Sequence, residues 1–416
     1  MSLKQKSVAT RLLFVALSLA LVYSLVLFAG CGSSSSSSDS PTPTPTPTAQ
    51  APAIADYART PISAFRTNTD YIYIHGNASP DGSKLYVALN ETTAGNGGSG
   101  AAMTGKFTSY LLKMSDVTAG TVTSASALVT SQTISAAVAF RSSWTPDGTK
   151  IVQAGADRVV VLKASDLSEL ANDTDITGTA DFAQNHDALA IDNNYALLSM
   201  QMRVNAGEQL TGGIELYDLN AKKRIGNPVD MCSACHDHAS ITTAHTLCGI
   251  DGKLTKSGST FTGKLYVAAT SGGHIGVVDV TIDPTNTTTP IVVNSATRIQ
   301  ITANAPAGAT STMPAFHDVR LDTTANRVYY SAIKVDGTST ADAGRAHIGY
   351  VDLADTNAST RVHDGTINAT TAAQSGLVYC GSGQTTDFFI PMTMSYPAYI
   401  DAVPKTVLRT GATLNP

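Results

Sequence analysis

Short apolar segments that end in aspartate recur along this chain at intervals of 49 to 73 residues. Each segment is four to seven residues long and rich in Ile, Leu, Val or Tyr, which is typical of a β-strand and too short for a helix. The segments are Leu111–Asp116, Val160–Asp166, Ile214–Asp218, Ile275–Asp279, Ile348–Asp352 and Ala398–Asp401. The repetition predicts an all-β fold built from similar units.

A second element, a turn followed by a short strand, precedes each of these segments. Its clearest copies are Pro80–Val87 and Pro146–Val152, which both begin with Pro-Asp-Gly. Proline fixes φ and glycine accepts a positive φ, so this tripeptide favours a tight turn. The later copies are Asp192–Asn194, Lys264–Val267, Arg327–Tyr330 and Leu377–Tyr379.

A unit of about 45 to 70 residues with three or four short strands is typical of a β-propeller blade. One blade cannot bury both faces of its sheet, so the blades are expected to pack into a ring. The segment Ser79–Val87 resembles the repeats of bacterial YVTN-type surface and periplasmic propellers, and the resemblance extends over residues 65–405. The chain is therefore expected to form a propeller of six or seven four-stranded blades over residues 57–416. A β-sandwich array and a β-helix are the alternative folds.

The first 30 residues have the pattern of an export signal. Lys4, Lys6 and Arg11 precede an uncharged apolar run from Leu12 to Gly30. The end of this run, Leu27–Cys31, resembles a bacterial lipobox, which implies cleavage before Cys31 and lipid attachment to that cysteine. Gly32 follows where an inner-membrane lipoprotein carries Asp, so the resemblance implies the outer membrane, on its periplasmic or cell-surface side. An uncleaved membrane anchor is the alternative.

Residues 31–56 form the predicted tether. They contain a serine run, Ser33–Ser38, and four Pro-Thr pairs over Pro41–Thr48. Such a segment cannot bury apolar area and is expected to be disordered, with the Pro-Thr part extended as polyproline II. The propeller would thus be held at a distance from a membrane that it contacts only through its lipid.

Composition narrows the functional classes. The formal net charge is −5 and only 14% of residues are charged, which does not favour a nucleic-acid-binding protein. The apolar content of 43% excludes a wholly disordered chain.

Histidines fall at a repeated place, six residues before each turn. The position is occupied by His75, Arg141, His186, His245 and His317, and His363 opens the sixth repeat in a similar place. In a propeller this position begins the innermost strand, so the side chains are expected to converge at one mouth of the ring. Converging imidazoles can ligate a metal, bind a porphyrin iron or transfer protons. Separate structural roles for each histidine are the alternative.

Cys232-Ser233-Ala234-Cys235-His236 matches the C-x-x-C-H signature of covalent c-type haem attachment. Two thiols in this spacing bond the haem vinyl groups, and the adjacent imidazole binds the iron. The motif lies in an insertion at 230–245, between the third and fourth repeats. His186, His245 and His317 are candidates for the sixth ligand, whereas His238 lies too close to His236 to reach the opposite side of the iron.

Other roles for the cysteines are possible interpretations of the sequence. The pair can belong to a zinc site completed by His238 and His245, to a redox dithiol, or to a structural disulfide. Cys248 and Cys380 lie in repeats that are not neighbours in the ring, which favours buried free thiols over a disulfide.

The sequence thus predicts an envelope-anchored monohaem c-type cytochrome on a propeller, with a redox partner protein in the envelope. Its role would be electron transfer or haem-dependent redox chemistry, and the sequence does not decide whether it is an enzyme. A copper propeller oxidoreductase resembling nitrous oxide reductase is a second hypothesis, because that family also gathers histidines at the mouth of a propeller. A surface binding propeller with a structural cysteine pair is a third.

Overall fold

The structure is a computed structural model. It describes residues 55–67, 70–93, 103–135, 137–155, 158–173, 185–200, 213–231, 247–269, 274–301, 315–333, 346–357, 360–367, 379–393 and 398–415. The chain divides into Met1–Ile54 and Ala55–Pro416, and all of the described residues belong to the second unit. The predicted signal peptide, the lipid attachment at Cys31 and nearly all of the tether lie outside the described residues.

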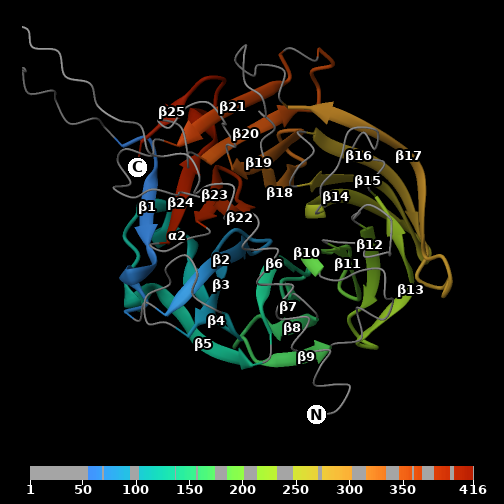
Figure 1. Ribbon diagram of the computed structural model, residues 1–416, viewed down its shortest axis with the longest axis horizontal. Helices are drawn as coiled ribbons and strands as arrows, with labels where there is room; N and C mark the ends of the chain where they lie inside the picture. The colour runs from blue at the N-terminus through green and yellow to red at the C-terminus, as the bar shows by residue number, and fades with distance from the viewer. Residues whose placement is uncertain are drawn as a thin grey trace, which may run out of the picture. The chain divides into compact units, whose positions relative to one another are not determined.

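Six sheets, antiparallel except for one short parallel strand in the fifth, stand as blades around a ring in this part of the chain (Figure 1). From the innermost strand outward, the first three blades are β2 (Tyr71–Ala78), β3 (Lys84–Thr92), β4 (Met103–Lys113), β5 (Ala127–Ser135); β6 (Ala139–Trp144), β7 (Lys150–Gly155), β8 (Val159–Lys163), β9 (Glu169–Asp173); and β10 (Asn185–Ala190), β11 (Tyr195–Met200), β12 (Gly213–Asp218), β13 (Lys223–Asp230). The prediction of an all-β propeller is confirmed, with six blades.

The other three blades follow the same order, except that the fifth has an extra strand and the outermost strand of the sixth comes from the N-terminal end of the domain. They are β14 (Leu247–Ser257), β15 (Thr260–Ala269), β16 (His274–Ile282), β17 (Ile291–Gln300); β18 (Ala315–Asp322), β19 (Arg327–Ile333), β20 (Ala346–Asp352), β21 (Val362–Ile367), with β25 (Thr413–Leu414); and β22 (Tyr379–Gln384), β23 (Phe388–Thr393), β24 (Tyr399–Pro404), with β1 (Ala58–Pro61) outermost. The segment between β4 and β5 contains a short helix, α2 (Met114–Ala119).

The N-terminal strand closes the ring. β1 pairs antiparallel with β24, with Ala58 opposite Ala402 and Pro61 opposite Tyr399. Arg59 donates two hydrogen bonds to the Asp401 carboxylate, from Nε to Oδ1 at 2.8 Å and from Nη2 to Oδ2 at 3.0 Å. The sixth blade is therefore made from both ends of the domain, and a prediction from the repeat alone does not include this strand.

The Pro-Asp-Gly turns are stabilised because the aspartate carboxylate accepts hydrogen bonds from the residues next to it. Asp81 accepts hydrogen bonds from Ser79 Oγ at 2.5 Å and from the Ser83 amide at 3.0 Å, and Gly82 adopts a φ of 68°. These hydrogen bonds lower the pKa of Asp81 to about 2. The second blade repeats the arrangement around Asp147. The sequence prediction of these two turns is thus confirmed in detail.

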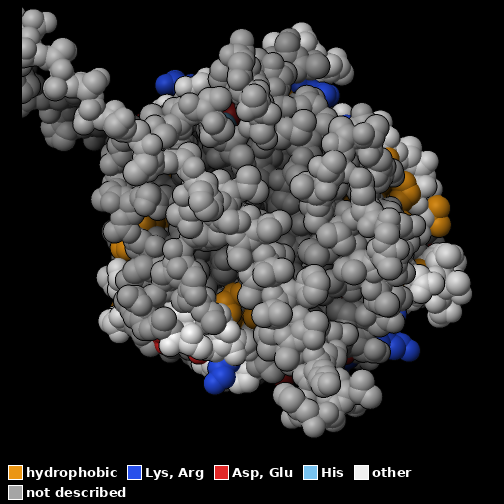
Figure 2. All heavy atoms as spheres, viewed as in Figure 1, with side chains coloured by type: hydrophobic (Ala, Val, Ile, Leu, Met, Phe, Trp, Pro, Cys, Tyr) orange, Lys and Arg blue, Asp and Glu red, His pale blue; other side chains and the backbone are white. Residues whose placement is uncertain are grey.

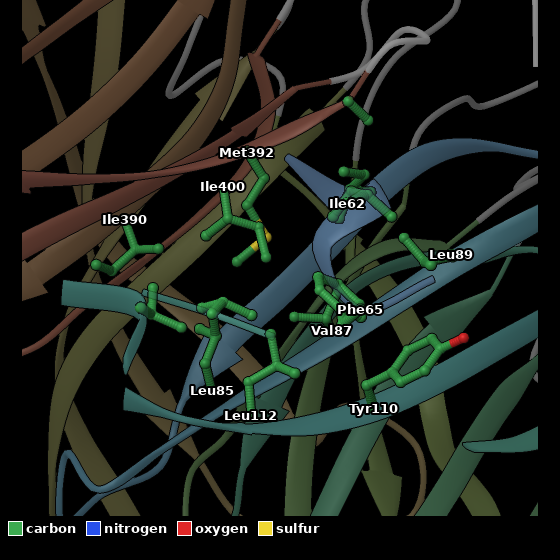
Figure 3. Close-up of a cluster of buried hydrophobic side chains, with 14 of the residues drawn as sticks. Ile62, Phe65, Leu85, Val87, Leu89, Tyr110, Leu112, Ile390, Met392 and Ile400 are labelled. Carbon is green, nitrogen blue, oxygen red and sulfur yellow. The ribbon is translucent and has the colours of Figure 1, made fainter. Parts of the chain in front are cut away.

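The core lies between the blades. Alternate residues of one strand face opposite neighbours: in β3, Leu85 and Val87 pack toward the sixth blade, and Tyr86 packs toward the second. Figure 3 shows the cluster between the first and sixth blades, in which Leu112 and Met392 take part. Strands buried on both faces read as continuous apolar runs, which is why the repeat is visible in the sequence.

Two register predictions are wrong. His245 is predicted to stand six residues before a turn, but the residue six positions on, Asp251, lies within β14, whose turn to β15 is at Gly258 and Ser259. Leu377–Tyr379 was expected as a second strand, but Tyr379 begins β22, the innermost strand, and the second strand is β23. In both blades the turn lacks Pro-Asp-Gly, so the sequence offered nothing to fix the register.

Candidate functional site

In the second, third and fifth blades the predicted position, held by Arg141, His186 and His317, coincides with a β-bulge, where a strand carries an extra residue against its neighbour. The register of the innermost strand shifts in five blades, at Ala139/Ser142, Asn185/Asp187, Leu247/Gly249, Phe316/Asp318 and Tyr379/Gly381. The residues within these shifts are Phe140 and Arg141, His186, Cys248, His317 and Cys380. In the first blade the shift falls between Ile72 and Ile74, just before His75. Bulges change the direction of side chains and are common beside functional sites.

Three of the predicted residues come together at the axis. The ring of Phe140, from the second blade, lies 4.6 Å from the ring of His186 in the third blade and 6.0 Å from that of His75 in the first. Arg141 Nη1 contacts His186 Nδ1. His75, Arg141 and His186 are all buried, at 0%, 1% and 5% exposure. Phe140 thus lies near both imidazole rings, and Arg141 contacts one of them.

The contact between Arg141 and His186 fixes what this histidine can do. Arginine has only donors, so His186 Nδ1 must accept the hydrogen bond and Nε2 must carry the proton. A neutral imidazole in this state has no free lone pair for a metal ion. The described arrangement therefore gives His186 a structural role beside Arg141.

Below these rings an ion-pair network fills the axis. We call Arg141, Asp187, Asp251, Asp318 and Arg320 the axial cluster. Arg320 Nη1 lies 3.1 Å from Asp187 Oδ2 and 3.1 Å from Asp318 Oδ1, and Arg141 Nε lies 3.7 Å from Asp318 Oδ1. Asp318 and Arg320 both belong to β18, whereas the Arg320–Asp187 and Arg141–Asp318 pairs join blades that are not neighbours, so at this level side chains occupy the centre of the ring.

Backbone amides also bind the carboxylates of the axial cluster. Asp187 accepts from the Ile250 amide at 3.0 Å, Asp251 from the Leu321 amide at 2.8 Å and Asp318 from the Ser382 amide at 2.8 Å. Each bond runs from one blade to the next. The three aspartates therefore link the third blade to the fourth, the fourth to the fifth and the fifth to the sixth.

Burial shifts the titration of the axial cluster. It raises the pKa of Asp187 to about 7 and that of Asp251 to about 6, although Arg320 opposes both shifts. Burial lowers the pKa of Arg320, but the carboxylates of Asp187 and Asp318 outweigh it and raise that pKa. The cluster has three carboxylates for two guanidinium groups, which favours one retained proton near neutral pH.

The remaining predicted residues are not part of this group. His363 lies in β21, an outer strand of the fifth blade, where its ring stacks on Tyr350 at 4.4 Å. Its assignment to the sixth repeat followed from the wrong register described above. For His317 the structure describes the strand position in β18 but not the side chain.

The haem-type motif lies outside the described residues, as do His238 and His245. Its flanks are described: β13 ends at Asp230 and β14 begins at Leu247. Because strands alternate in direction within a blade, both flanks lie at the end of the ring where the innermost strands begin. That end also carries His75 and His186.

Sequence reasoning missed a polar triad in the fifth blade. Asp364 of β21 accepts a hydrogen bond from Tyr330 of β19 at 2.8 Å and pairs with His347 Nδ1 of β20 at 2.7 Å. Tyr330 reaches across β20 because Gly349 has no side chain: a Cβ there would lie 2.5 Å from the tyrosine oxygen. Burial raises the pKa of Tyr330 well above its ordinary value, so its hydroxyl acts as a donor. Only the strand register brings these residues together, and the sequence does not reveal it.

Among the described side chains, no group of three or more His, Cys, Asp or Glu residues is arranged to hold a metal ion. The described residues also include no helix long and apolar enough to span a bilayer. In Figure 2, the Lys and Arg side chains of described residues that are visible lie around the rim of the ring.

Comparisons with known proteins show only distant likeness. No family model matches the chain, and no curated protein matches it. Among solved structures, a member of the DUF4221 family from Bacteroides vulgatus has a TM-score of 0.45 at 10% identity, covering 85% of this chain and 97% of that one. The β-propeller domain of Cps50 (Swd1) from Myceliophteria thermophila has 0.41 at 9% identity, covering 83% and 99%. A chain of the mitotic checkpoint complex has 0.39 at 7%, covering 92% and 100%. The propeller assignment therefore rests on the strand order of this chain itself.

Proposed function

We propose that this protein is a monohaem c-type cytochrome carried on a lipid-anchored propeller, and that it transfers electrons in the bacterial envelope. The observation that carries the proposal is C-x-x-C-H at Cys232–His236 in a chain that also has an export signal. Covalent haem attachment takes place outside the bacterial cytoplasm, so the motif and the signal require the same compartment.

The donor set fits the cofactor by its chemistry. Cys232 and Cys235 would bond the haem through thioethers, and His236 would bind the iron. When bound, haem supplies a one-electron couple. The flanks of the connection that carries the motif, Asp230 and Leu247, lie at the same end of the ring as His75 and His186, which supports a haem at that end.

The sixth ligand is proposed among His245 and His317. His186 is a weaker candidate, because Arg141 occupies its Nδ1 lone pair. The ion pairs of the axial cluster cross the centre of the ring below this end. This supports placing the proposed haem chemistry at this end of the ring and not along its whole axis.

Expression of the full chain with a c-type haem maturation system tests the proposal. We expect a Soret band and a haem-staining band that survives denaturing electrophoresis. Cys232→Ala combined with Cys235→Ala should lose both signals, whereas Cys248→Ser should keep the covalent haem. Folded protein without covalent haem would contradict the proposal, and zinc or copper retained by the Cys232–Cys235 pair would favour the non-haem alternative.

The anchor is tested separately. We expect labelled fatty acid to be incorporated into the wild type and lost in Cys31→Ser. A wild type that takes up no label and keeps an uncleaved N-terminus would support the anchor-helix alternative. The envelope redox partner is then sought by reduction assays with the released soluble form.

A further inference from the structure

A glutamate of the third blade is fully buried without a hydrogen bond. Glu215 of β12 is 0% exposed, and neither of its carboxylate oxygens has a hydrogen-bond partner among the residues that the structure describes. No other acidic side chain in the described part of the chain is left in this state. A buried carboxylate is costly unless a cation or a proton neutralises it, so Glu215 points to a ligand.

Glu215 faces the boundary between the second and third blades. β12 pairs with β11 without interruption, so its side chains alternate regularly between the two faces of the sheet. Ile214 and Leu216 pack toward the fourth blade, and Tyr217 packs toward the second. Glu215 therefore points to the same side as Tyr217. The Tyr217 hydroxyl donates there to Asp173 Oδ2 of β9 at 3.1 Å, which positions a second carboxylate at this boundary.

The charges around Glu215 agree with this placement. Burial raises the pKa of Glu215 well above its ordinary value, Arg224 opposes the shift, and the like charge of Asp173 adds to it. Arg224 of β13 is the cross-strand partner of Tyr217, but it makes no hydrogen bond to Glu215. Two carboxylates thus stand against one guanidinium. Asp173 and Arg224 are half-buried, so the boundary is open to solvent on their side.

We propose that Glu215 and Asp173 bind one Ca²⁺ ion between the second and third blades. A cation held by both oxygens of Glu215 would satisfy them together, whereas a proton would leave one oxygen without a donor. The donors are carboxylate and hydroxyl oxygens, which suit Ca²⁺ and Mg²⁺ better than zinc or copper. Ca²⁺ is favoured because it accepts bidentate carboxylates in irregular geometry and completes its shell with water and backbone carbonyls. The site contains no cysteine or histidine and does not depend on haem.

Thermal unfolding with and without Ca²⁺ tests the site. The full chain is treated with a chelator and then unfolded in chelator, in Ca²⁺ and in Mg²⁺, with circular dichroism as the signal. We expect the unfolding temperature to rise in Ca²⁺ and to rise less in Mg²⁺, because a ligand that binds only the folded state stabilises it. Tb³⁺, which replaces Ca²⁺ at oxygen sites, should luminesce when tyrosine is excited, since Tyr217 lies beside Asp173.

Isosteric variants decide whether the two acids act together. Glu215→Gln and Asp173→Asn each remove one charge from one blade, and each should lose the Ca²⁺-induced shift and the Tb³⁺ luminescence. Glu169→Gln, exposed on the same strand as Asp173, should keep both. Because Asp173 is half-buried, Asp173→Asn decides the outcome if Glu215→Gln does not fold.

Two results would overturn the proposal. One is a folded wild type with the same unfolding temperature in Ca²⁺ and in chelator; if Glu215→Gln is then more stable than the wild type, Glu215 holds a proton instead of a metal ion. The other is a Ca²⁺-induced shift that persists in both Glu215→Gln and Asp173→Asn, which would place the bound Ca²⁺ elsewhere.

Discussion

Arg320 of the fifth blade reaches past the fourth to Asp187 of the third, with 3.1 Å between Nη1 and Oδ2. Both side chains are buried, so the pair is shielded from solvent screening. We expect Arg320→Met to destabilise the domain by about 3 to 5 kcal/mol, because it leaves buried carboxylates without their cation. Urea unfolding followed by circular dichroism measures the change.

Lys163→Met provides the control for this experiment. Lys163 pairs with Asp166 at 3.0 Å, but both side chains are about half exposed. Such surface pairs contribute little to stability because solvent screens both charges. Equal losses of stability in the two variants would refute the importance of the axial pair.

The raised pKa of Asp187 predicts a pH dependence of folding. This carboxyl has a pKa of about 7 in the folded chain against 3.8 ordinarily, so between these values the folded state binds the proton more tightly. Its contribution to stability is fully present below pH 3.8 and is lost as the pH rises through about 7. The slope from one such group is at most about 1.4 kcal/mol per pH unit.

Asp187→Asn should remove that contribution. Unfolding free energies measured from pH 4 to pH 8 are expected to fall with pH more steeply in the wild type than in the variant. Asp251 shifts in the same direction, so a smaller slope should persist. Parallel curves for the two proteins would show that Asp187 does not titrate in this range.

Arg59 and Asp401 hold the closing strand. Their side chains are 10% and 0% exposed, and the two hydrogen bonds between them have the parallel geometry that only a guanidinium provides. We expect Arg59→Met to cost about 3 to 5 kcal/mol. Arg59→Lys keeps the charge but not the paired donors, and should lie in between.

Hydrogen exchange gives a local measure of the same change. Amides of β1 and of its partner β24 should exchange faster in Arg59→Met, while those of the third blade keep their protection. Uniform loss of protection in all blades would mean that the pair stabilises the domain as a whole, not the closure.

Gly349→Ala should disrupt the triad of the fifth blade. The added methyl would approach the Tyr330 hydroxyl and the carbonyl oxygen of His363 in a fully paired region of the sheet. Overpacking of this kind costs about 1 to 3 kcal/mol. Thermal unfolding measures the loss, and a crystal structure would show whether the bond from Tyr330 to Asp364 is broken.

Gly365→Ala is the matched control, since its nearest contact would be the Ala412 carbonyl oxygen at 3.3 Å. A smaller effect is expected because that neighbour lies at the edge of the sheet. If Gly365→Ala were the more damaging change, the argument from the crossing tyrosine would fail.

The fold was largely predictable because inner strands such as β7, β8 and β11 are buried on both faces. Runs such as Val159–Leu162 repeat in every blade, and aspartate turns mark the first two hairpins. The long hairpin of the fourth blade and the register of the sixth were not predictable, because Gly258 and Asp387 replace the usual turn residues. β1 was also missed, since its four residues have no repeat pattern and pair with a strand more than 300 residues away.

The site was predictable in part. Counting six residues back from a turn gave His75, Arg141 and His186; Phe140 lies near both imidazole rings, and Arg141 contacts His186. The same rule pointed to His245 in the fourth blade, whereas the bulge there is at Cys248. The axial ion pairs were not predictable, because Asp187 and Arg320 are 133 residues apart and meet only once the ring has closed.

The closing strand has a mechanical consequence. β1 begins at Ala58, four residues after the unit Met1–Ile54 ends, so any tension carried by that segment enters the domain through β1. Three sets of interactions would bear that load first. They are the four paired residues of β1, the hydrogen-bonded ion pair of Arg59 with Asp401, and the hydrogen bond from the Asp56 amide to the Asn415 carbonyl at 2.9 Å. When the domain is pulled from its N-terminal side, β1 should separate from β24 and open the ring before any complete blade unfolds.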